Sequence, residues 1–174
     1  MVTDLREIRR LGEAKQAENL QFRRFLAGHH VSAEPFQILA AHVQEQTDCK
    51  VCANCCRYSV VPVIKAEIEA IAQKLGLQYE EAEHRYTEPD PDCRTRRILR
   101  STAGGCVFLK GNICTIYDHR PSVCRSFPHV LPGDHALGSR FSSLCRWASL
   151  CPIIYNALEE YKHLVGYHPP RRAT

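Results

Sequence analysis

Apolar residues recur at helical spacing in several stretches of this chain, and this pattern predicts a helix-rich protein. Residues 65–76 give the clearest case, because three apolar side chains, Ile68, Ile71 and Leu75, share one face. Gly76 then provides a stop signal. Further helices are predicted over four stretches: residues 3–27, a segment that Ser32 and Pro35 begin, residues 78–86 and residues 152–165.

Short runs of β-branched residues predict a few strands between these helices. Residues 58–63 have this composition, and Pro62 marks the run as an edge strand or the end of a strand. Residues 97–101 are a further candidate strand. Residues 87–94 contain prolines and aspartates and predict a loop. Residues 127–144 are also expected to be rich in loops.

Residues 106–109 and 113–117 predict a β-hairpin across a loop at residues 110–112. With this three-residue loop, Cys106 and Cys114 share one face of the hairpin and form a diagonal pair. A two-residue loop would instead put the two thiols on opposite faces, because side chains alternate along a strand.

Together these patterns predict an α+β fold, a small helix-rich domain with a short antiparallel β-hairpin, organised around cysteine-ligated metal or a cluster. Residues 1–44 are expected to form an N-terminal helical extension. Residues 45–165 would form the cysteine-cluster metal-binding domain, and residues 166–174 a tail. Pro121 is expected in the first turn of a short helix that carries Cys124.

The composition is that of an ordinary globular chain. At 174 residues and 44% hydrophobic, it has enough apolar material for a core without covalent links. Its formal net charge of +4 is too small to indicate a nucleic-acid partner. No stretch approaches the roughly 20 apolar residues of a membrane span, and the charged N-terminus does not resemble a secretory signal. We therefore expect a cytoplasmic protein with no membrane and no nucleic-acid partner.

Ten cysteines dominate the candidate chemistry, and four of them fall within the segment CKVCANCC. In a reducing compartment such thiols are more often metal ligands or catalytic groups than disulfides. The C-x2-C-x2-C spacing of Cys49, Cys52 and Cys55 is one that holds cubane iron–sulfur clusters in bacterial-type ferredoxins. Cys56 follows directly and points elsewhere, so it is expected to serve a second site or to support the first. Disulfides and small buried hydrophobic side chains are the alternatives.

Basic residues flank Cys124 in the second half of the chain. Unpaired N–H groups at a helix start favour a thiolate there. Arg120 and Arg125 are candidate cofactor-binding residues, because a cluster with four thiolate ligands is net negative. A surface ion pair is the alternative for both arginines. His119 and His129 also bracket this cysteine and are the best histidine candidates for ligands.

The order of these motifs resembles the YkgJ-type cysteine-cluster family, also described as a zinc- or iron-chelating CxxCxxCC domain. The resemblance covers roughly residues 45–152 and rests on CKVCANCC, on GGCVFLKGNICTIYDHRPSVCRSFPH and on the final Cys-Pro. Cys93 and Cys145 lie outside the pattern. The resemblance implies eight metal ligands: Cys49, Cys52, Cys55, Cys56, Cys106, Cys114, Cys124 and Cys151.

Functions of different classes are compatible with such a site. In the first hypothesis the chain is an iron–sulfur protein with a redox or electron-transfer role, and it could be an iron–sulfur oxidoreductase. A 4Fe–4S cluster would be held by Cys49, Cys52 and Cys55, with Cys124 or Cys151 as the fourth ligand. In the second, zinc is structural and the protein is an interaction module. In the third, the protein carries metal or cluster to clients. A redox or client protein is the expected partner, and the sequence indicates no substrate, catalytic residue or oligomeric state.

Overall fold

The chain forms two compact units in the computed structural model, which describes residues 1–29, 31, 32, 34–130 and 137–169. One unit is helical and combines residues 1–48 with residues 128–174. The other comprises residues 49–127 and contains eight of the ten cysteines. The predicted domains followed chain order, whereas in the structure residues 128–165 group with the N-terminal helices. The predicted tail lies outside the described residues from residue 170 on.

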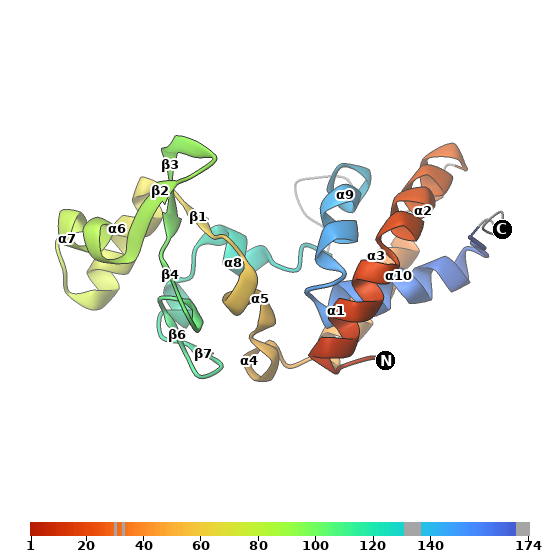
Figure 1. Ribbon diagram of the computed structural model, residues 1–174, viewed down its shortest axis with the longest axis horizontal. Coiled ribbons are helices and arrows are strands. Elements are labelled where there is room, and N and C mark those ends of the chain that lie inside the picture. The colour runs from red at the N-terminus through yellow and green to blue at the C-terminus, as the bar shows by residue number, and fades with distance from the viewer. Residues whose placement is uncertain (30, 33, 131–136, 170–174) are drawn as a thin grey trace. The chain divides into compact units, whose positions relative to one another are not determined.

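Five described helices build the helical unit: α1 (Leu5–Ala14), α2 (Gln16–Gly28), α3 (Glu34–Glu45), α9 (Leu137–Trp147) and α10 (Pro152–Leu164) (Figure 1). The helix predicted over residues 3–27 is divided at Lys15, whose ψ of 5° leaves the helical range. The prediction of a loop-rich stretch over residues 127–144 is wrong from residue 137 on, where α9 begins. The helices predicted after Pro35 and over residues 152–165 are confirmed.

Aromatic side chains fill the core of the helical unit, in which α10 packs against α3 and α2 packs against α9. Phe22 meets Phe141 and Tyr161 edge-on, with ring centroids 5.7 and 5.6 Å apart. Phe36 packs tilted against Tyr161 at 5.4 Å. Aromatic pairs of this kind add about 0.5–1.5 kcal/mol each beyond the burial of the rings.

A buried ion-pair network lies in the same unit, on α10. The Lys162 ammonium is almost fully buried and donates hydrogen bonds of 2.6 Å to the carboxylates of Glu18 and Glu159. Lys15 also pairs with Glu159. These ion pairs join α2 to α10, since Glu18 lies on α2 whereas Glu159 and Lys162 lie on α10. The opposite charges beside Lys162 offset the cost of burying its ammonium group.

The unit of residues 49–127 contains a three-stranded antiparallel sheet and several helices, of which α6 (Lys65–Leu75) and α7 (Tyr79–Tyr86) are the longest. Both helices were predicted, and Gly76 ends α6 in a left-handed conformation as expected. In spatial order the strands are β1 (Pro62–Val63), β3 (Cys93–Leu99) and β2 (Thr87–Asp90) (Figure 1).

The sheet corrects two predictions. Residues 87–94, predicted as a loop, form β2, a turn and the start of β3. Pro89 is tolerated in β2 because this strand lies at the edge of the sheet, where a missing N–H breaks no ladder. Of the strand predicted over residues 58–63, only the last two residues form β1. Its first residue, Tyr58, belongs instead to helix α5 (Asn54–Tyr58).

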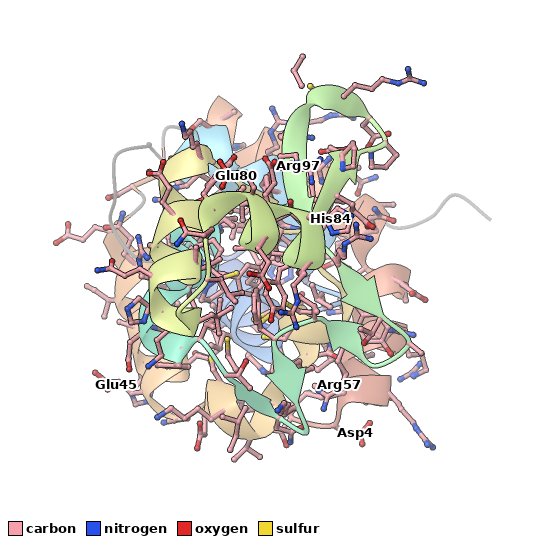
Figure 2. The ribbon with its side chains drawn as sticks, turned by 90° about the vertical axis from the view of Figure 1, so that its left-hand side faces the viewer. Asp4, Glu45, Arg57, Glu80, His84 and Arg97 are labelled. Atoms are coloured by element: carbon pink, nitrogen blue, oxygen red, sulfur yellow. The ribbon has the colours of Figure 1, made fainter. Side chains whose placement is uncertain are left out.

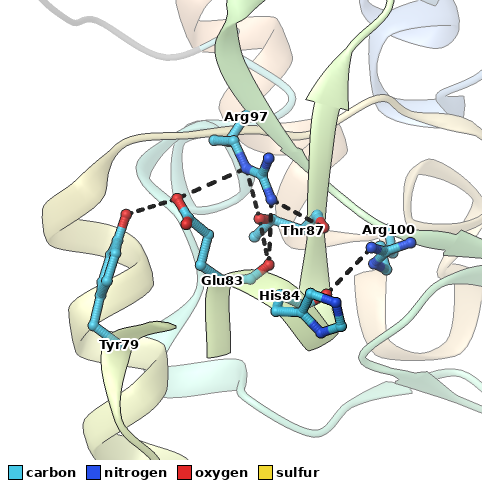
Figure 3. Close-up of polar contacts among 6 residues, drawn as sticks. All are labelled: Tyr79, Glu83, His84, Thr87, Arg97 and Arg100. Atoms are coloured by element: carbon cyan, nitrogen blue, oxygen red, sulfur yellow. Dashed lines mark hydrogen bonds and ion pairs between the residues drawn. The ribbon is translucent and has the colours of Figure 1, made fainter. Parts of the chain in front are cut away.

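Arg97 of β3 fastens the sheet to α7 (Figure 3). Its guanidinium donates to the Thr87 hydroxyl at 3.0 Å and to the Glu83 carbonyl at 3.4 Å, and it lies 3.8 Å from the Glu83 carboxylate. Tyr79 donates to that carboxylate at 2.8 Å. Arg100 donates to a further carbonyl of α7 at 3.2 Å. These bonds therefore hold the end of β3, from which the chain continues to Cys106 and Cys114, against α7.

Two short antiparallel ladders follow: β4 (Ser101–Thr102) with β5 (Gly105–Cys106), and β6 (Leu109–Lys110) with β7 (Ile113–Cys114). The 3₁₀ helix η1 (Tyr117–His119) and the predicted short helix α8 (Ser122–Ser126) come next. The core cluster of this unit consists of buried apolar side chains: Val61, Val63, Ile68, Ile71, Ala72, Ala82, Leu99, Phe108 and Ile116.

The predicted fold class is confirmed, because the structure combines helices with short antiparallel strand pairs, as expected of a small α+β protein. None of the helices in the described part of the chain has the length and apolar character needed to cross a membrane.

Candidate metal centre

The first cysteine run folds as two short helical turns that a left-handed residue separates. Helix α4 (Cys49–Cys52) comes first, Ala53 follows with a φ of 47°, and α5 then begins. Ala53 is 3% exposed, and its N–H donates to the Cys49 carbonyl at 2.9 Å. Because the left-handed residue interrupts the helical path, the run presents its four thiols from two separate turns.

Strand β5 lies directly on α5 because residue 105 is a glycine. Gly105 has a φ of 113°, and a Cβ atom there would lie 2.6 Å from the Arg57 Cα and 2.7 Å from the Cys56 carbonyl oxygen. Only a residue without a side chain permits this approach. The contact brings the next residue, Cys106, beside Cys56, and the charges of the two thiols interact.

The β6–β7 hairpin has a two-residue loop, which corrects the predicted register. Leu109 pairs with Cys114, so that Gly111 and Asn112 alone form the loop. In one continuous hairpin this loop would put Cys106 and Cys114 on opposite faces. In the structure Cys106 belongs to β5, and a turn separates it from β6, so strand alternation does not relate the two thiols.

Arg57 and Asn112 fasten the hairpin loop to α4. The Asn112 side-chain amide donates to the Val51 carbonyl at 2.7 Å. Arg57 donates to the Cys52 carbonyl at 3.0 Å, to the Gly111 carbonyl at 3.4 Å and to the Asn112 side-chain oxygen. Figure 2 shows Arg57 beside this hairpin. The first cysteine run and the second half of the site are thus joined by backbone carbonyls and two side chains.

Helix α8, which carries Cys124, is held in place by Glu67 of α6. One Glu67 carboxylate oxygen accepts from the Ser122 N–H and hydroxyl, both at 2.7 Å, and the other accepts from the Ile64 N–H at 3.0 Å. Burial raises the pKa of Glu67, but these hydrogen bonds and the nearby charge of Arg125 outweigh it and hold that pKa below its ordinary value. One carboxylate therefore caps the starts of both α6 and α8.

Four thiols from these segments, hereafter the four-thiol group, come within electrostatic reach of one another: Cys56, Cys106, Cys114 and Cys124. The last three of them also pack against the core cluster of this unit. None of the ten cysteines forms a disulfide. The structure therefore collects one thiol each from α5, β5, β7 and α8, and three of these four thiols lie against one apolar wall.

Burial and mutual repulsion keep most of the group protonated. Burial and the charges of its three neighbours raise the pKa of Cys124 to about 12. Burial also raises the pKa values of Cys106 and Cys114, to which the Cys56 charge contributes. Since metals bind thiolates, a metal entering this group must displace protons from it.

Cys56 is the exception within the four-thiol group. A hydrogen bond from the Cys55 thiol lowers the pKa of Cys56 most, burial opposes it, and the charges of Arg120 and Arg57 lower it further, to about 6. Adjacent thiols were expected to point apart, yet here they lie within hydrogen-bond reach. Of the four thiols, Cys56 is therefore the one whose surroundings favour the thiolate.

The two predicted cofactor-binding arginines have different surroundings. Arg120 lies with its Cζ atom 3.7 Å from the centroid of the Tyr117 ring and donates to the Tyr117 carbonyl at 2.9 Å. Its charge lowers the pKa values of three members of the four-thiol group. Arg125 donates to the Arg120 carbonyl and acts electrostatically on Glu67. Of the two, Arg120 is the one whose charge acts on the thiols.

The other predicted ligands lie at different depths. Cys49 is exposed, and Cys52 and Cys55 are half-buried. Cys151 is buried in the helical unit and begins α10. The assignment of Cys49, Cys52 and Cys55 to one cluster stays a prediction.

Two cysteines that the motif omits have contrasting environments. Cys93 is exposed on β3. Cys145 is buried in the helical unit and donates to the Asn19 carbonyl at 3.5 Å, and burial raises its pKa to about 11. Of the histidine candidates, His119 has a buried Nδ1 that lacks a hydrogen-bond partner among the described residues. His129 belongs to the helical unit, where its ring stacks on Trp147.

Several residues that build the centre were missed by sequence reasoning: Arg57, Glu67, Gly105 and Asn112. The Gly-Gly pair before Cys106 and the Gly-Asn pair in the hairpin were visible signals of tight turns. The contacts by which Arg57 and Glu67 join the two halves of the site had no local signal, because they reach residues 54 or 55 positions away in the chain. Over the described residues, no three Cys, His, Asp or Glu side chains are close enough to hold a metal ion as they stand.

The comparison with family models gives one match, "CxxCxxCC: Putative zinc- or iron-chelating domain", over residues 48–151. This range spans more than half of the chain and includes all eight cysteines of the predicted ligand set. The comparisons with curated proteins and with solved structures give no match.

Proposed function

Since this chain belongs to the CxxCxxCC family of zinc- or iron-chelating domains, we propose that it is an iron–sulfur protein with an electron-transfer role. The four-thiol group would provide the ligands of the cluster. The observation that carries the proposal is the convergence of Cys56, Cys106, Cys114 and Cys124 from four separate elements, with the last three packed against one apolar wall. Four thiolates are the donor set that both common types of cluster use.

The residues around the four-thiol group suit a net negative centre such as a cluster. A cluster with four thiolate ligands is net negative, and Arg120 and Arg57 place positive charge beside it. Phe108 and Ile116, each 3% exposed or less, exclude water from one side of the group. When bound, an iron–sulfur cluster supplies one-electron transfer, and positive charge near it raises its reduction potential.

Anaerobic purification followed by iron, zinc and acid-labile sulfide analysis tests the metal assignment. We expect a coloured protein with iron and sulfide in equal amounts and little zinc. Colourless protein with stoichiometric zinc and no sulfide would refute the iron–sulfur assignment. Purification in air is unsuitable, because zinc can occupy thiolate sites that have lost a cluster.

Serine variants test the ligand set. Cys106→Ser, Cys114→Ser and Cys124→Ser should each lower the iron content strongly. Cys145→Ser is the matched control for a buried thiol, and Cys93→Ser the control for an exposed one; both should retain the cluster. If serine at positions 49, 52 and 55 removes the cluster while the three site variants keep it, the ligands are those of the ferredoxin-like spacing and the four-thiol group is not the centre.

Structural zinc is the second candidate function, and one observation favours it. The group contains four thiols, the number that closes a tetrahedral zinc site. A structural zinc ion would exchange slowly with chelators, and its removal would unfold the unit of residues 49–127. A metal carrier would instead lose its metal to a chelator within minutes while its circular dichroism stays unchanged.

A further inference from the structure

Charge is unevenly distributed along the unit that carries the four-thiol group. The two segments that contain its cysteines, residues 49–58 and 105–127, hold five Lys and Arg residues and one acidic residue, Asp118. The intervening residues 59–104 hold seven basic and eight acidic residues. The positive charge of the unit therefore belongs to the segments around the candidate centre.

Four large apolar side chains are exposed on the same two segments. Tyr58, at the end of α5, is 58% exposed, and the other three lie on α4, β7 and η1. Val51 of α4 is 69% exposed, Ile113 of β7 is 65% exposed and Tyr117 of η1 is 38% exposed. Single exposed apolar residues are common on protein surfaces and need no explanation. Here, however, three of them occur on the short elements that carry or adjoin Cys49, Cys52 and Cys114.

Two contacts connect the elements that carry Val51, Ile113 and Tyr117. The bond from Asn112 to the Val51 carbonyl places the residue before Ile113 against α4. Lys50 of α4 lies 5.0 Å from the centroid of the Tyr117 ring, which connects α4 to η1. Lys50 and Lys110 are both exposed, on α4 and on β6. This surface, hereafter the docking face, consists of Lys50, Val51, Lys110, Ile113 and Tyr117.

We propose that the docking face binds a small acidic electron-carrier protein, whose carboxylates surround an apolar contact. This inference rests on the proposed function, for which it names the partner. Opposite charges steer such partners together and set the orientation, while a small apolar centre keeps the complex short-lived. Electron-transfer encounters have interfaces of this limited size. Ile113 of this face directly precedes Cys114 of the four-thiol group on β7, so a carrier bound there approaches the candidate centre.

Binding of an acidic flavodoxin to the full chain provides the test, with affinity measured by fluorescence anisotropy at several salt concentrations. We expect Lys50→Glu/Lys110→Glu to weaken binding roughly tenfold, which corresponds to about 1.4 kcal/mol, and to flatten its salt dependence. Val51→Ser/Ile113→Ser should weaken binding without changing the salt dependence. The matched controls are Arg94→Glu, an exposed cation on β3, and Ile38→Ser, a 64% exposed apolar residue on α3. Both should bind like the wild type.

The outcomes separate this inference from the proposed function, because binding is measured whatever metal the protein holds. A protein that carries a cluster and binds flavodoxin equally well in all variants would overturn the docking face and leave the function intact. A protein that carries only zinc but loses flavodoxin binding in the two site variants would overturn the function and support the docking face. Binding to vesicles of anionic phosphatidylglycerol but not to flavodoxin would also overturn the proposal, since the partner would then be a lipid surface.

Discussion

Replacing Gly105 by alanine should separate the two halves of the candidate centre. The backbone at this position has a φ of 113°, which L-residues adopt only with strain of about 1–3 kcal/mol. The added methyl group would lie 2.6 and 2.7 Å from backbone atoms of Arg57 and Cys56, which cannot rotate away. Overpacking of this kind typically costs about 1–3 kcal/mol more. The total of roughly 2–6 kcal/mol is a large part of the stability of an ordinary domain.

Urea unfolding followed by circular dichroism measures this loss, and metal analysis of the folded variant measures its effect on the centre. Because the methyl group must push β5 away from α5, Cys106 moves away from Cys56 and the metal content should fall. Gly111→Ala is the matched control. Gly111 also has a positive φ, 62°, but no atom lies within 4 Å of a Cβ placed there. Its variant should lose only about 1–2 kcal/mol and keep its metal.

Two results would contradict this reasoning. One is a Gly105→Ala protein no less stable than Gly111→Ala, which would mean that β5 does not lie against α5. The other is a destabilised Gly105→Ala protein with the full metal content, which would mean that Cys56 and Cys106 do not share a site.

Three further predictions concern stability and can be measured by urea unfolding. Glu67→Ala removes the cap of two helix starts and should cost about 1–2 kcal/mol at neutral pH. Because the folded pKa of Glu67 lies below 4.5, its contribution is present above that pH and is lost as the pH falls through the folded value, so the difference between wild type and variant should shrink in acid; an unchanged difference would contradict the capping role. Lys162→Met removes a buried cation from beside two half-buried carboxylates and should cost about 1–3 kcal/mol, against about 0.5 kcal/mol or less for the exposed Lys65→Met; equal losses would mean that Lys162 is solvated. Ile116→Ala, at a site 1% exposed, should cost about 2–5 kcal/mol, whereas Val60→Ala, at a site 67% exposed, should be nearly neutral; a neutral Ile116→Ala would show that this wall of the centre is not packed.

Elements with local signals could be predicted from the order of residues alone. The periodic apolar face of residues 65–76 predicted α6, and Pro121 and Pro152 marked the starts of α8 and α10. The order and spacing of eight cysteines determined the family and hence metal binding. Each of these signals depends on neighbours within a few residues or on side-chain chemistry. None of them requires knowledge of the tertiary structure.

The packing of separate elements determines which thiols lie close together. The predicted three-residue loop put Cys106 and Cys114 on one face, and the two-residue loop of the structure would separate them in a continuous hairpin, but a turn assigns Cys106 to another ladder. A glycine contact then brings Cys106 to Cys56, and Glu67 fixes the helix that carries Cys124. These contacts join residues about 50 positions apart in the chain. They depend on how separately formed elements pack, which no local pattern of residues encodes.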